Sequence, residues 1–219
     1  MIVIAGDSWG CGEWGEHPEK GYSLLHQGIE HYLKNLGLNV VNLSLPGGSN
    51  SFATYRLSNF NLTVNDKIIW FQTDPIRDLR PYNTNFTNII KNYDSFIKEQ
   101  NSLLDSTYKK LNDLNISICC IGGCSKLNLV LLQKYNNLIP LIPSAIQFFY
   151  PDYNHPDIWT SEWINYITAN CTLDFIEPQK LKQDLLYENE YSEFFYPDGK
   201  HMNRKAHKVL TDYIIRNYL

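Results

Sequence analysis

The chain alternates short apolar runs with stretches in which apolar residues recur at helical spacing, and this alternation narrows the possible folds sharply. Apolar runs of strand length occupy 2–5, 38–45, 67–73 and 116–121. Helices are predicted over 22–36, 50–60, 86–114 and 203–218. Strands that alternate with helices predict an α/β fold with a mainly parallel sheet and right-handed crossovers. We expect a single domain over 1–219.

The segment after the fourth strand is harder to interpret. Two prolines interrupt 139–149, and within it we predict a short strand at 145–148. Further helices are predicted at 158–169 and 178–187. The whole range 128–196 has the length of an insertion that would cover a site on the sheet.

Composition excludes several classes of function. The net charge of -4 argues against nucleic-acid binding, which needs a basic face. No apolar run approaches the roughly 20 residues of a membrane span, and no cationic segment followed by an apolar one opens the sequence. We therefore expect a cytoplasmic protein, or one carried by or released from a virus particle. Abundant asparagine, tyrosine, isoleucine and lysine indicate an AT-rich genome, bacterial or viral.

The five cysteines are odd in number and have no metal-ligand spacing. Cys119 and Cys120 are adjacent in a predicted buried strand, where neighbouring side chains point to opposite faces. We interpret the cysteines as small buried residues in a reducing compartment, with a metal site or a disulfide framework as the alternatives. No metal or cofactor is expected.

Polar and small residues follow three of the predicted strands, at 6–10, 45–50 and 72–75. Ligands of an open parallel sheet bind beyond the carboxyl ends of its strands, so these loops should share one rim. Asp198 and His201 precede the last helix and can reach the same rim. Serine becomes a nucleophile when an imidazole takes its proton, so Ser8 with this pair predicts acyl-transfer chemistry.

These segments together resemble the blocks of the SGNH (GDSL) hydrolases, a family of serine esterases and lipases. Gly6-Asp7-Ser8 matches the first block, and Gly47, in the run from Asn42, matches the second. The family's third block is Gly-x-Asn-Asp, where this chain has Phe-Gln-Thr-Asp at 71–74. The Asp-x-x-His at 198–201 matches the last block. The resemblance spans nearly the whole chain and implies a flavodoxin-like three-layer sandwich, with about five parallel strands between helices.

The resemblance also implies residue roles. Ser8 would be the nucleophile, His201 the general base, and Asp198 the partner that fixes the imidazole tautomer. The oxyanion hole would use the backbone N–H groups of Ser8 and Gly47, with Thr73 in the place of the family's asparagine. Glycine suits position 47 because a Cβ would crowd the oxyanion and restrict the backbone.

Other residues near these blocks have two interpretations. Gln72 or Asn50 would support the oxyanion hole beside Thr73. These two residues, together with Trp9 and Asp74, would also contact substrate. Arg77 and Arg80 would bind an anionic substrate group or form salt bridges with Asp74 and Asp78, and the salt bridges are favoured. Three aromatic residues near the blocks would form walls of the pocket or local core, namely Trp9, Trp14 and Tyr196. Glu13 and Glu16 are interpreted as solvated acids. The other histidines are interpreted as surface or structural residues, namely His17, His26, His31, His155 and His207.

The sequence therefore predicts a serine ester hydrolase that cleaves a small acyl group, such as acetyl on a carbohydrate, through an acyl-Ser8 intermediate. The substrate would be a small-molecule or glycan ester. One alternative is a non-catalytic carbohydrate-binding or assembly module with the same fold, and another is an acyltransferase. Gly47-Gly48 as a phosphate- or flavin-binding loop is disfavoured because the spacing does not match. The sequence does not indicate an oligomeric state.

Overall fold

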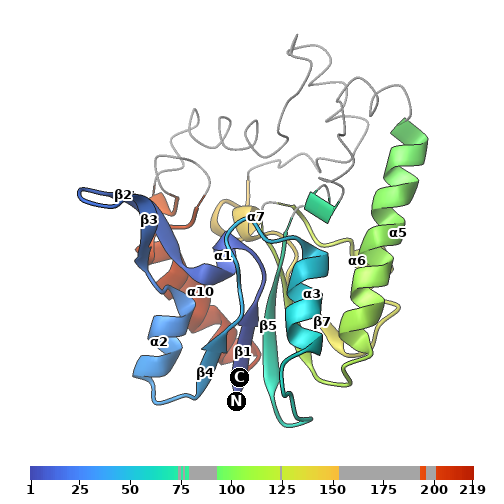
Figure 1. The fold of residues 1–219 in the computed structure, drawn as a ribbon, viewed down its shortest axis with the longest axis horizontal. Coiled ribbons are helices and arrows are strands. Elements are labelled where there is room, and N and C mark those ends of the chain that lie inside the picture. The colour runs from blue at the N-terminus through green and yellow to red at the C-terminus, as the bar shows by residue number, and fades with distance from the viewer. Residues whose placement is uncertain (74, 76, 79–92, 124, 153–192, 196–200) are drawn as a thin grey trace.

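The computed structural model describes residues 1–73, 75, 77–78, 93–123, 125–152, 193–195 and 201–219. Its centre is a five-stranded sheet in the order β4-β1-β5-β6-β7 (Figure 1). Every neighbouring pair in this sheet is parallel. The strands are β1 (Ile2–Ala5), β4 (Val40–Asn42), β5 (Lys67–Gln72), β6 (Ile118–Gly122) and β7 (Leu138–Ile142). The α/β fold with a parallel sheet is as the sequence predicts.

Helices cover both faces of the sheet because the central strands are apolar on both sides. In β1, Ile2 and Ile4 pack into one core, while Val3 and Ala5 pack into the other. Besides Trp9, the first core includes residues of α2 (Ile29–Asn35), α7 (Ala145–Phe149) and α10 (Arg204–Asn217). The second includes residues of α3 (Asn50–Ser58), α5 (Tyr93–Asn112) and α6 (Leu129–Leu132). These two cores make a three-layer arrangement around the sheet.

The cysteines that the structure describes are buried and free, namely Cys11, Cys119 and Cys120. Cys119 lies in one core and Cys120 in the other, as the alternation of side chains along a strand predicts. Burial raises the pKa of both β6 thiols above the ordinary value. Cys124 and Cys171 lie outside the described residues.

The predicted helix at 22–36 is only partly correct. Its second half is α2, but its first half is β3 (Gly21–His26), which pairs antiparallel with β2 (Glu13–His17). Gly28 separates the two with a φ of 54°, a conformation that a continuous helix does not allow. Leu24 opposes Trp14 across the hairpin and is 41% exposed, so its helical spacing to the residues of α2 does not reflect a shared core face.

The predicted strand at 145–148 is wrong, because these residues belong to the helix α7. Ser144 caps that helix by accepting a hydrogen bond from the backbone N–H of Gln147. The strand comes earlier, as β7, and contains Pro140. Proline removes a backbone donor, and β7 tolerates it because it is the edge strand of the sheet. Part of the range 128–196 is therefore integral to the sheet, and 153–192 lies outside the described residues.

The remaining predicted elements agree with the structure where it describes them. Ser49 caps α3, and Asn203 caps α10. The predicted start of the long helix at 86 and the helices at 158–169 and 178–187 fall outside the described residues. In the part of the chain that is described, no helix is both long and apolar enough to cross a membrane.

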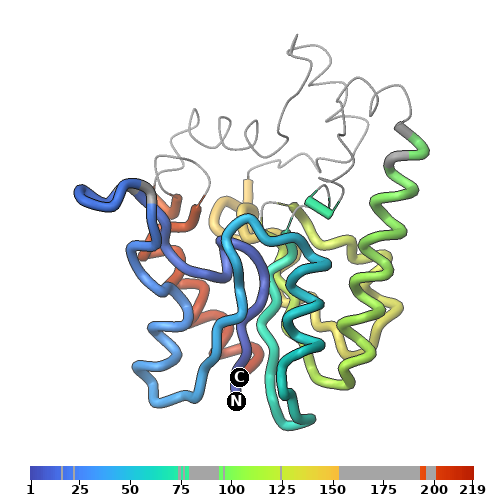
Figure 2. The backbone as a smooth tube through the Cα atoms, viewed as in Figure 1, coloured from blue at the N-terminus to red at the C-terminus, as the bar shows by residue number. Residues whose placement is uncertain are grey.

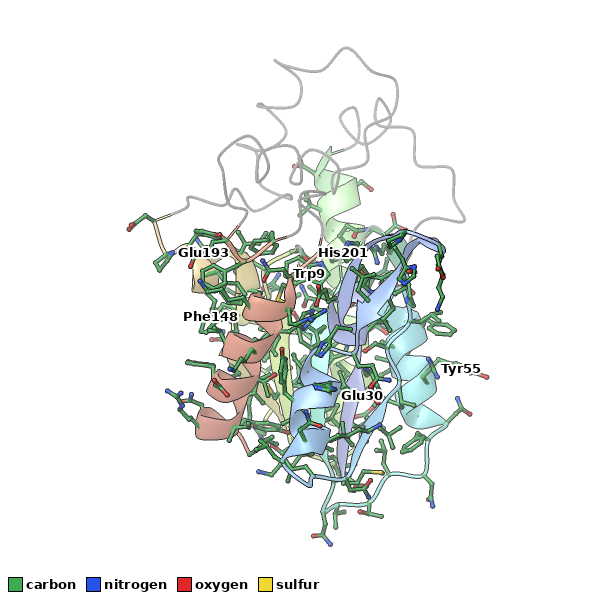
Figure 3. The ribbon with its side chains drawn as sticks, turned by 90° about the vertical axis from the view of Figure 1, so that its left-hand side faces the viewer. Trp9, Glu30, Tyr55, Phe148, Glu193 and His201 are labelled. Atoms are coloured by element: carbon green, nitrogen blue, oxygen red, sulfur yellow. The ribbon has the colours of Figure 1, made fainter. Side chains whose placement is uncertain are left out.

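The two ends of the chain lie together at the end of the sheet where β1 begins (Figure 2). The Nζ of Lys67 donates to the carbonyl of Tyr218 at 2.7 Å, and the hydroxyl of Tyr218 donates to the carbonyl of Ile68 at 3.1 Å. The carboxyl ends of the strands point the other way. Figure 3 places Trp9 and His201 together at that opposite end.

Candidate active site

Ser8 begins a short helix just after the strand β1, which lies inside the sheet between β4 and β5. Gly6 ends the strand with a φ of 147°, and a Cβ there would lie 2.7 Å from the carbonyl oxygen of Phe71. Asp7 then caps α1 (Ser8–Cys11), since its Oδ1 accepts a hydrogen bond from the backbone N–H of Trp9 at 3.0 Å. This tight turn presents Ser8 at the carboxyl end of the strand, where its side chain is 6% exposed.

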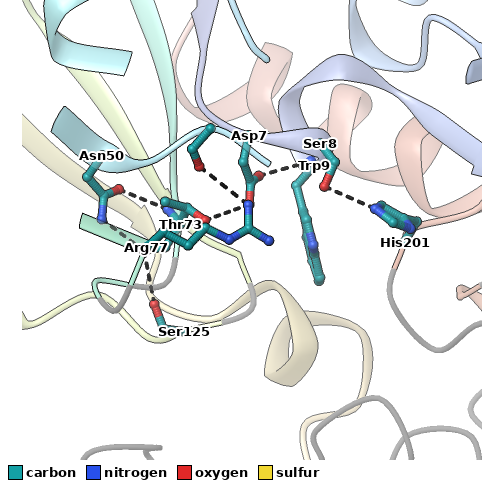
Figure 4. Close-up of polar contacts among 9 residues, drawn as sticks. Asp7, Ser8, Trp9, Asn50, Thr73, Arg77, Ser125 and His201 are labelled. Carbon is teal, nitrogen blue, oxygen red and sulfur yellow. Dashed lines mark hydrogen bonds and ion pairs between the residues drawn. The ribbon is translucent and has the colours of Figure 1, made fainter. Parts of the chain in front are cut away.

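His201 comes from the other end of the sequence and meets Ser8. Its Nε2 lies 3.0 Å from the Oγ of Ser8, although the two residues are 193 positions apart (Figure 4). With the ring proton on Nδ1, Nε2 accepts the hydrogen bond from the serine hydroxyl. This is the distance required for a nucleophile and its general base. Asp198 lies outside the described residues, so its role stays a prediction.

The segment that carries His201 is fixed on both sides. Met202 forms a bridge with Phe195, and the backbone N–H of Asn203 donates to the carbonyl of Phe194 at 2.9 Å. Asn203 also caps α10, with its Oδ1 accepting from the backbone N–H of Ala206 at 3.0 Å. The histidine is therefore held between the start of a helix and a short bridged segment, and it is 9% exposed.

The β2–β3 hairpin packs against this segment. The rings of Trp14 and His201 have centroids 6.3 Å apart, and the Nε of Arg204 donates to the Oε2 of Glu13 at 2.9 Å. Glu13 is 5% exposed, so the interpretation of this acid as solvated is wrong. Its partner lies 191 positions away, and no local pattern in the sequence indicates it.

The third block is organised around Asp7. The hydroxyl of Thr73 donates to the Oδ2 of Asp7 at 2.7 Å. The backbone N–H of Thr73 donates to Asn50 and its carbonyl accepts from the same side chain, both at 3.0 Å. A hydroxyl carries one proton, and here Asp7 accepts it. Direct donation from Thr73 to an oxyanion stays a prediction, and it requires this hydroxyl to turn away from Asp7.

Arg77 completes the contacts of Asp7. Its guanidinium donates to the Oδ2 of Asp7 at 3.1 Å and to the carbonyl of Gly48 at 3.4 Å (Figure 4). Both partners of the ion pair are buried, with 10% of the arginine side chain and 2% of the aspartate side chain exposed. Arg77 therefore has a salt-bridge partner that is 70 positions away. The nearby Asp78 accepts from the backbone N–H of Ser51 at 2.9 Å, and Asp74 and Arg80 lie outside the described residues.

Gln72 has its hydrogen bonds inside the protein. Its Oε1 accepts from the hydroxyl of Tyr108 at 2.6 Å, and its Nε2 donates to the carbonyl of Lys126 at 2.9 Å. The side chain is 1% exposed. Asn50 is equally buried and is engaged with Thr73, as described above. Contacts of either residue with an oxyanion or a substrate stay predictions, and these internal partners compete with them.

Gly47 is exposed and has a φ of 69°. A Cβ at this position would meet no protein atom within 4 Å. Within the protein, glycine is therefore favoured here by the left-handed backbone conformation and not by steric crowding.

Trp9 is 2% exposed and packs against Phe195 with ring centroids 5.7 Å apart. This burial fits the interpretation of Trp9 as local core better than its interpretation as a wall of the pocket. Tyr196 lies outside the described residues.

Two further titratable groups lie close to the site. Burial, and then the charge of Asp7, raise the pKa of Cys11 to about 12, so this thiol stays protonated and does not compete as a nucleophile. His207 in α10 is 0% exposed, and its burial lowers its pKa to about 4. A Cβ at Gly28 would lie 2.7 Å from its Nδ1, which shows how closely the ring packs against the backbone there. Among the described residues, no three His, Cys, Asp or Glu side chains are arranged to hold a metal ion.

An α/β fold with this sheet order, a serine after β1 and a histidine before α10, matches the arrangement implied by the SGNH resemblance. Among solved structures, the chain is similar to protein YxiM from Bacillus subtilis, with a TM-score of 0.51 and 13% identity. That match covers 98% of this chain and 55% of YxiM. The chain is also similar to TesA, with a TM-score of 0.44 and 13% identity over 98% of this chain and 96% of TesA.

By sequence, no protein-family model and no curated protein matches the chain. The structural likeness to YxiM agrees with the α/β fold that the motif resemblance implies. At this identity the likeness concerns the fold alone, and this chain corresponds to about half of the length of YxiM.

Proposed function

We propose that the protein is a serine ester hydrolase that acts through an acyl-Ser8 intermediate. The observation that supports this most directly is the 3.0 Å contact between the Oγ of Ser8 and the Nε2 of His201. The contact joins the serine at the start of α1 with a buried imidazole, and both groups lie at the carboxyl end of a parallel sheet. This is the place where ligands of such sheets bind.

In the proposed reaction His201 takes the hydroxyl proton as Ser8 attacks the ester carbonyl. The C=O double bond becomes a single bond to an oxyanion, which accepts hydrogen bonds from the backbone N–H groups of Ser8 and Gly47. The oxyanion then collapses, the C–O bond to the alcohol breaks, and His201 gives its proton to the leaving alkoxide. Water, activated by the same imidazole, attacks the acyl-serine and releases the acid. Asp198 would accept the Nδ1 proton of His201.

We propose a small acyl group, such as acetyl on a carbohydrate hydroxyl. Trp9, next to the nucleophile, is 2% exposed and packs on Phe195, so tightly packed aromatic rings lie on this side of Ser8. A long acyl chain would need to displace that packing. A panel of para-nitrophenyl esters of rising chain length, together with acetylated glycans, tests this part. A rate that rises with chain length would contradict it.

The test of the proposal is covalent labelling with a fluorophosphonate probe. We expect the wild type to react at Ser8, with the serine oxygen bonded to phosphorus and fluoride released, and to hydrolyse short esters. Ser8→Ala removes the nucleophile and His201→Ala removes its base, so each variant should lose labelling and at least about a thousandfold in kcat. Arg216→Gln, at an exposed position near the end of α10, serves as the control. Wild-type activity that equals that of Ser8→Ala would refute the proposal.

One observation supports a second candidate. The hydroxyl of Thr73 is engaged with Asp7, and a site in which this hydroxyl does not donate to an oxyanion would suit a non-catalytic carbohydrate-binding module. Calorimetric titration with glycans separates the two functions. Binding that survives in Ser8→Ala, combined with an unlabelled wild type, would favour the module.

A further inference from the structure

A buried carboxylate lies next to the proposed nucleophile. Asp7 precedes Ser8 in the chain and is 1% exposed. Charges interact strongly where water is excluded. The proposed reaction places a second negative charge, the oxyanion, beside the backbone N–H of Ser8. A lone carboxylate at position 7 would therefore oppose the transition state of the very reaction that Ser8 begins.

The structure supplies a cation for this carboxylate. Arg77 lies 3.1 Å from its Oδ2, and the hydroxyl of Thr73 donates to the same oxygen at 2.7 Å. The other oxygen accepts from the backbone N–H of Trp9 at 3.0 Å. With 10% of its side chain exposed, Arg77 acts on Asp7 with little screening by solvent. Figure 4 shows its guanidinium group between Thr73 and the start of α1.

We propose that Arg77 is a positioning residue that acts through Asp7: it neutralises the carboxylate, so that the oxyanion at Ser8 develops beside a neutral pair. The inference rests on the proposed acyl-Ser8 chemistry and adds a determinant of its rate. The proposal also gives a reason for a positively charged residue at position 77. With the Thr73 proton accepted by Asp7, Arg77 supplies a positive charge to the same carboxylate.

A purely structural role for the ion pair makes a different prediction. If the pair only holds the 6–10 turn, removing either partner should harm the reaction to a similar degree, because each change breaks the same contact. If charge is what matters, the two changes differ in sign. Arg77→Gln leaves a buried negative charge beside the oxyanion, whereas Asp7→Asn leaves a positive one.

The experiment compares Arg77→Gln, Asp7→Asn and the double variant, with kcat and KM measured on a short para-nitrophenyl ester. We expect Arg77→Gln to lower kcat about a hundredfold with KM nearly unchanged, because the oxyanion exists only in the transition state. Asp7→Asn keeps a good helix cap and should stay within about tenfold of the wild type. In the double variant, kcat should recover at least about tenfold relative to Arg77→Gln.

Arg216→Gln is the matched control, since it removes an arginine charge at an exposed position far along α10. Equal losses in both single variants, with no recovery in the double variant, would overturn the inference. If Arg77→Gln does not fold, the comparison of Arg77→Lys with the wild type and of the double variant with Asp7→Asn replaces it. Arg77→Lys keeps the charge and should stay within about tenfold of the wild type, and the double variant should stay within about tenfold of Asp7→Asn. A loss of about a hundredfold or more in Arg77→Lys would overturn the inference, because the charge is then not what matters.

Labelling of Ser8 by the fluorophosphonate distinguishes this inference from the proposed function. The labelling rates should fall in the order wild type, Asp7→Asn, double variant, Arg77→Gln. A wild type that labels, but with equal rates in Asp7→Asn and Arg77→Gln, would refute the role of Arg77 alone. A wild type that does not label at all would refute the proposed function.

Discussion

Thr73 contacts Asp7 from the position at which the SGNH resemblance implies an oxyanion donor. Where the SGNH resemblance implies an asparagine, this chain has a shorter side chain whose proton goes to Asp7 at 2.7 Å. Thr73 and Asp7 are both nearly fully buried, with 2% and 1% exposed. The hydroxyl of Thr73 therefore contacts the 6–10 loop through the Asp7 carboxylate, and the backbone of Thr73 is held by the side chain of Asn50.

This contact leads to a prediction about stability. Thr73→Val removes the hydroxyl while it keeps the shape, so Asp7 loses one donor in a buried place. We expect the free energy of unfolding to fall by about 1–3 kcal/mol, as measured by urea denaturation, and Thr73→Ser to restore most of it. A Thr73→Val variant that is as stable as the wild type but loses a hundredfold or more in kcat would instead indicate a direct oxyanion donor.

At the scale of elements, the site depends on how α10 begins. Asn203 caps the helix two residues after His201, and its Nδ2 donates to the carbonyl of Glu193 at 2.8 Å. The cap therefore joins the histidine segment to the bridged segment 193–195. Because the imidazole is positioned by these backbone contacts, the start of α10 should influence the reaction as well as stability.

Asn203→Ala tests this coupling. Loss of the cap should lower the free energy of unfolding by about 1 kcal/mol, and the loosened histidine should lower kcat with little change in KM. Asn203→Asp keeps the capping oxygen but not the donor to Glu193, so it should recover the stability more fully than the rate. Thermal unfolding and ester hydrolysis measured on the same preparations check both effects. Unchanged kcat in Asn203→Ala would contradict the coupling.

The sequence predicted the elements whose pattern follows from burial alone. The strands β1, β5 and β6 are covered on both faces, and their continuous apolar runs made them visible. It missed β7, because Pro140 is tolerated only where the strand lies at the edge, and a sequence does not reveal which strand that is. The hairpin was missed because its apolar residues continue the helical spacing of α2.

In the candidate site too, contacts marked by local motifs could be predicted and contacts set by long-range packing could not. The pairing of Ser8 with His201 was predictable because short motifs mark both residues. The contacts of Asp7 with Arg77 and of Glu13 with Arg204 were not, since they join residues 70 and 191 positions apart with no shared motif. Such pairs are set by the packed tertiary structure.

At the scale of the whole molecule, His207 links the stability of the fold to pH. Burial lowers its pKa to about 4, while the unfolded chain has an ordinary histidine pKa near 6.5. Between these values the unfolded state binds more protons, so acid favours unfolding. The contribution of neutral His207 is fully present above about pH 6.5 and is lost as the pH falls toward about 4.

We therefore expect the wild type to lose about 2 kcal/mol more than His207→Leu when the pH falls from 7 to 5. The measurement is the free energy of unfolding in urea at each pH, which compares the slopes of the two proteins rather than their absolute stabilities. His17→Gln, in the β2 strand, is the control and should retain the wild-type slope. Equal slopes in wild type and His207→Leu would show that this histidine does not control the acid sensitivity.

The separation of 193 positions between Ser8 and His201 also has a consequence during synthesis. Ser8 is synthesised before His201, and β7, the last described strand of the sheet along the chain, ends at Ile142, well before the histidine. On the proposed function, the growing polypeptide therefore holds Ser8 without its proposed base while the residues between the two are made. If Ser8 and His201 react as proposed, acylation of Ser8 requires α10 to have docked, so covalent capture of this serine would report a late step of folding in a newly made chain.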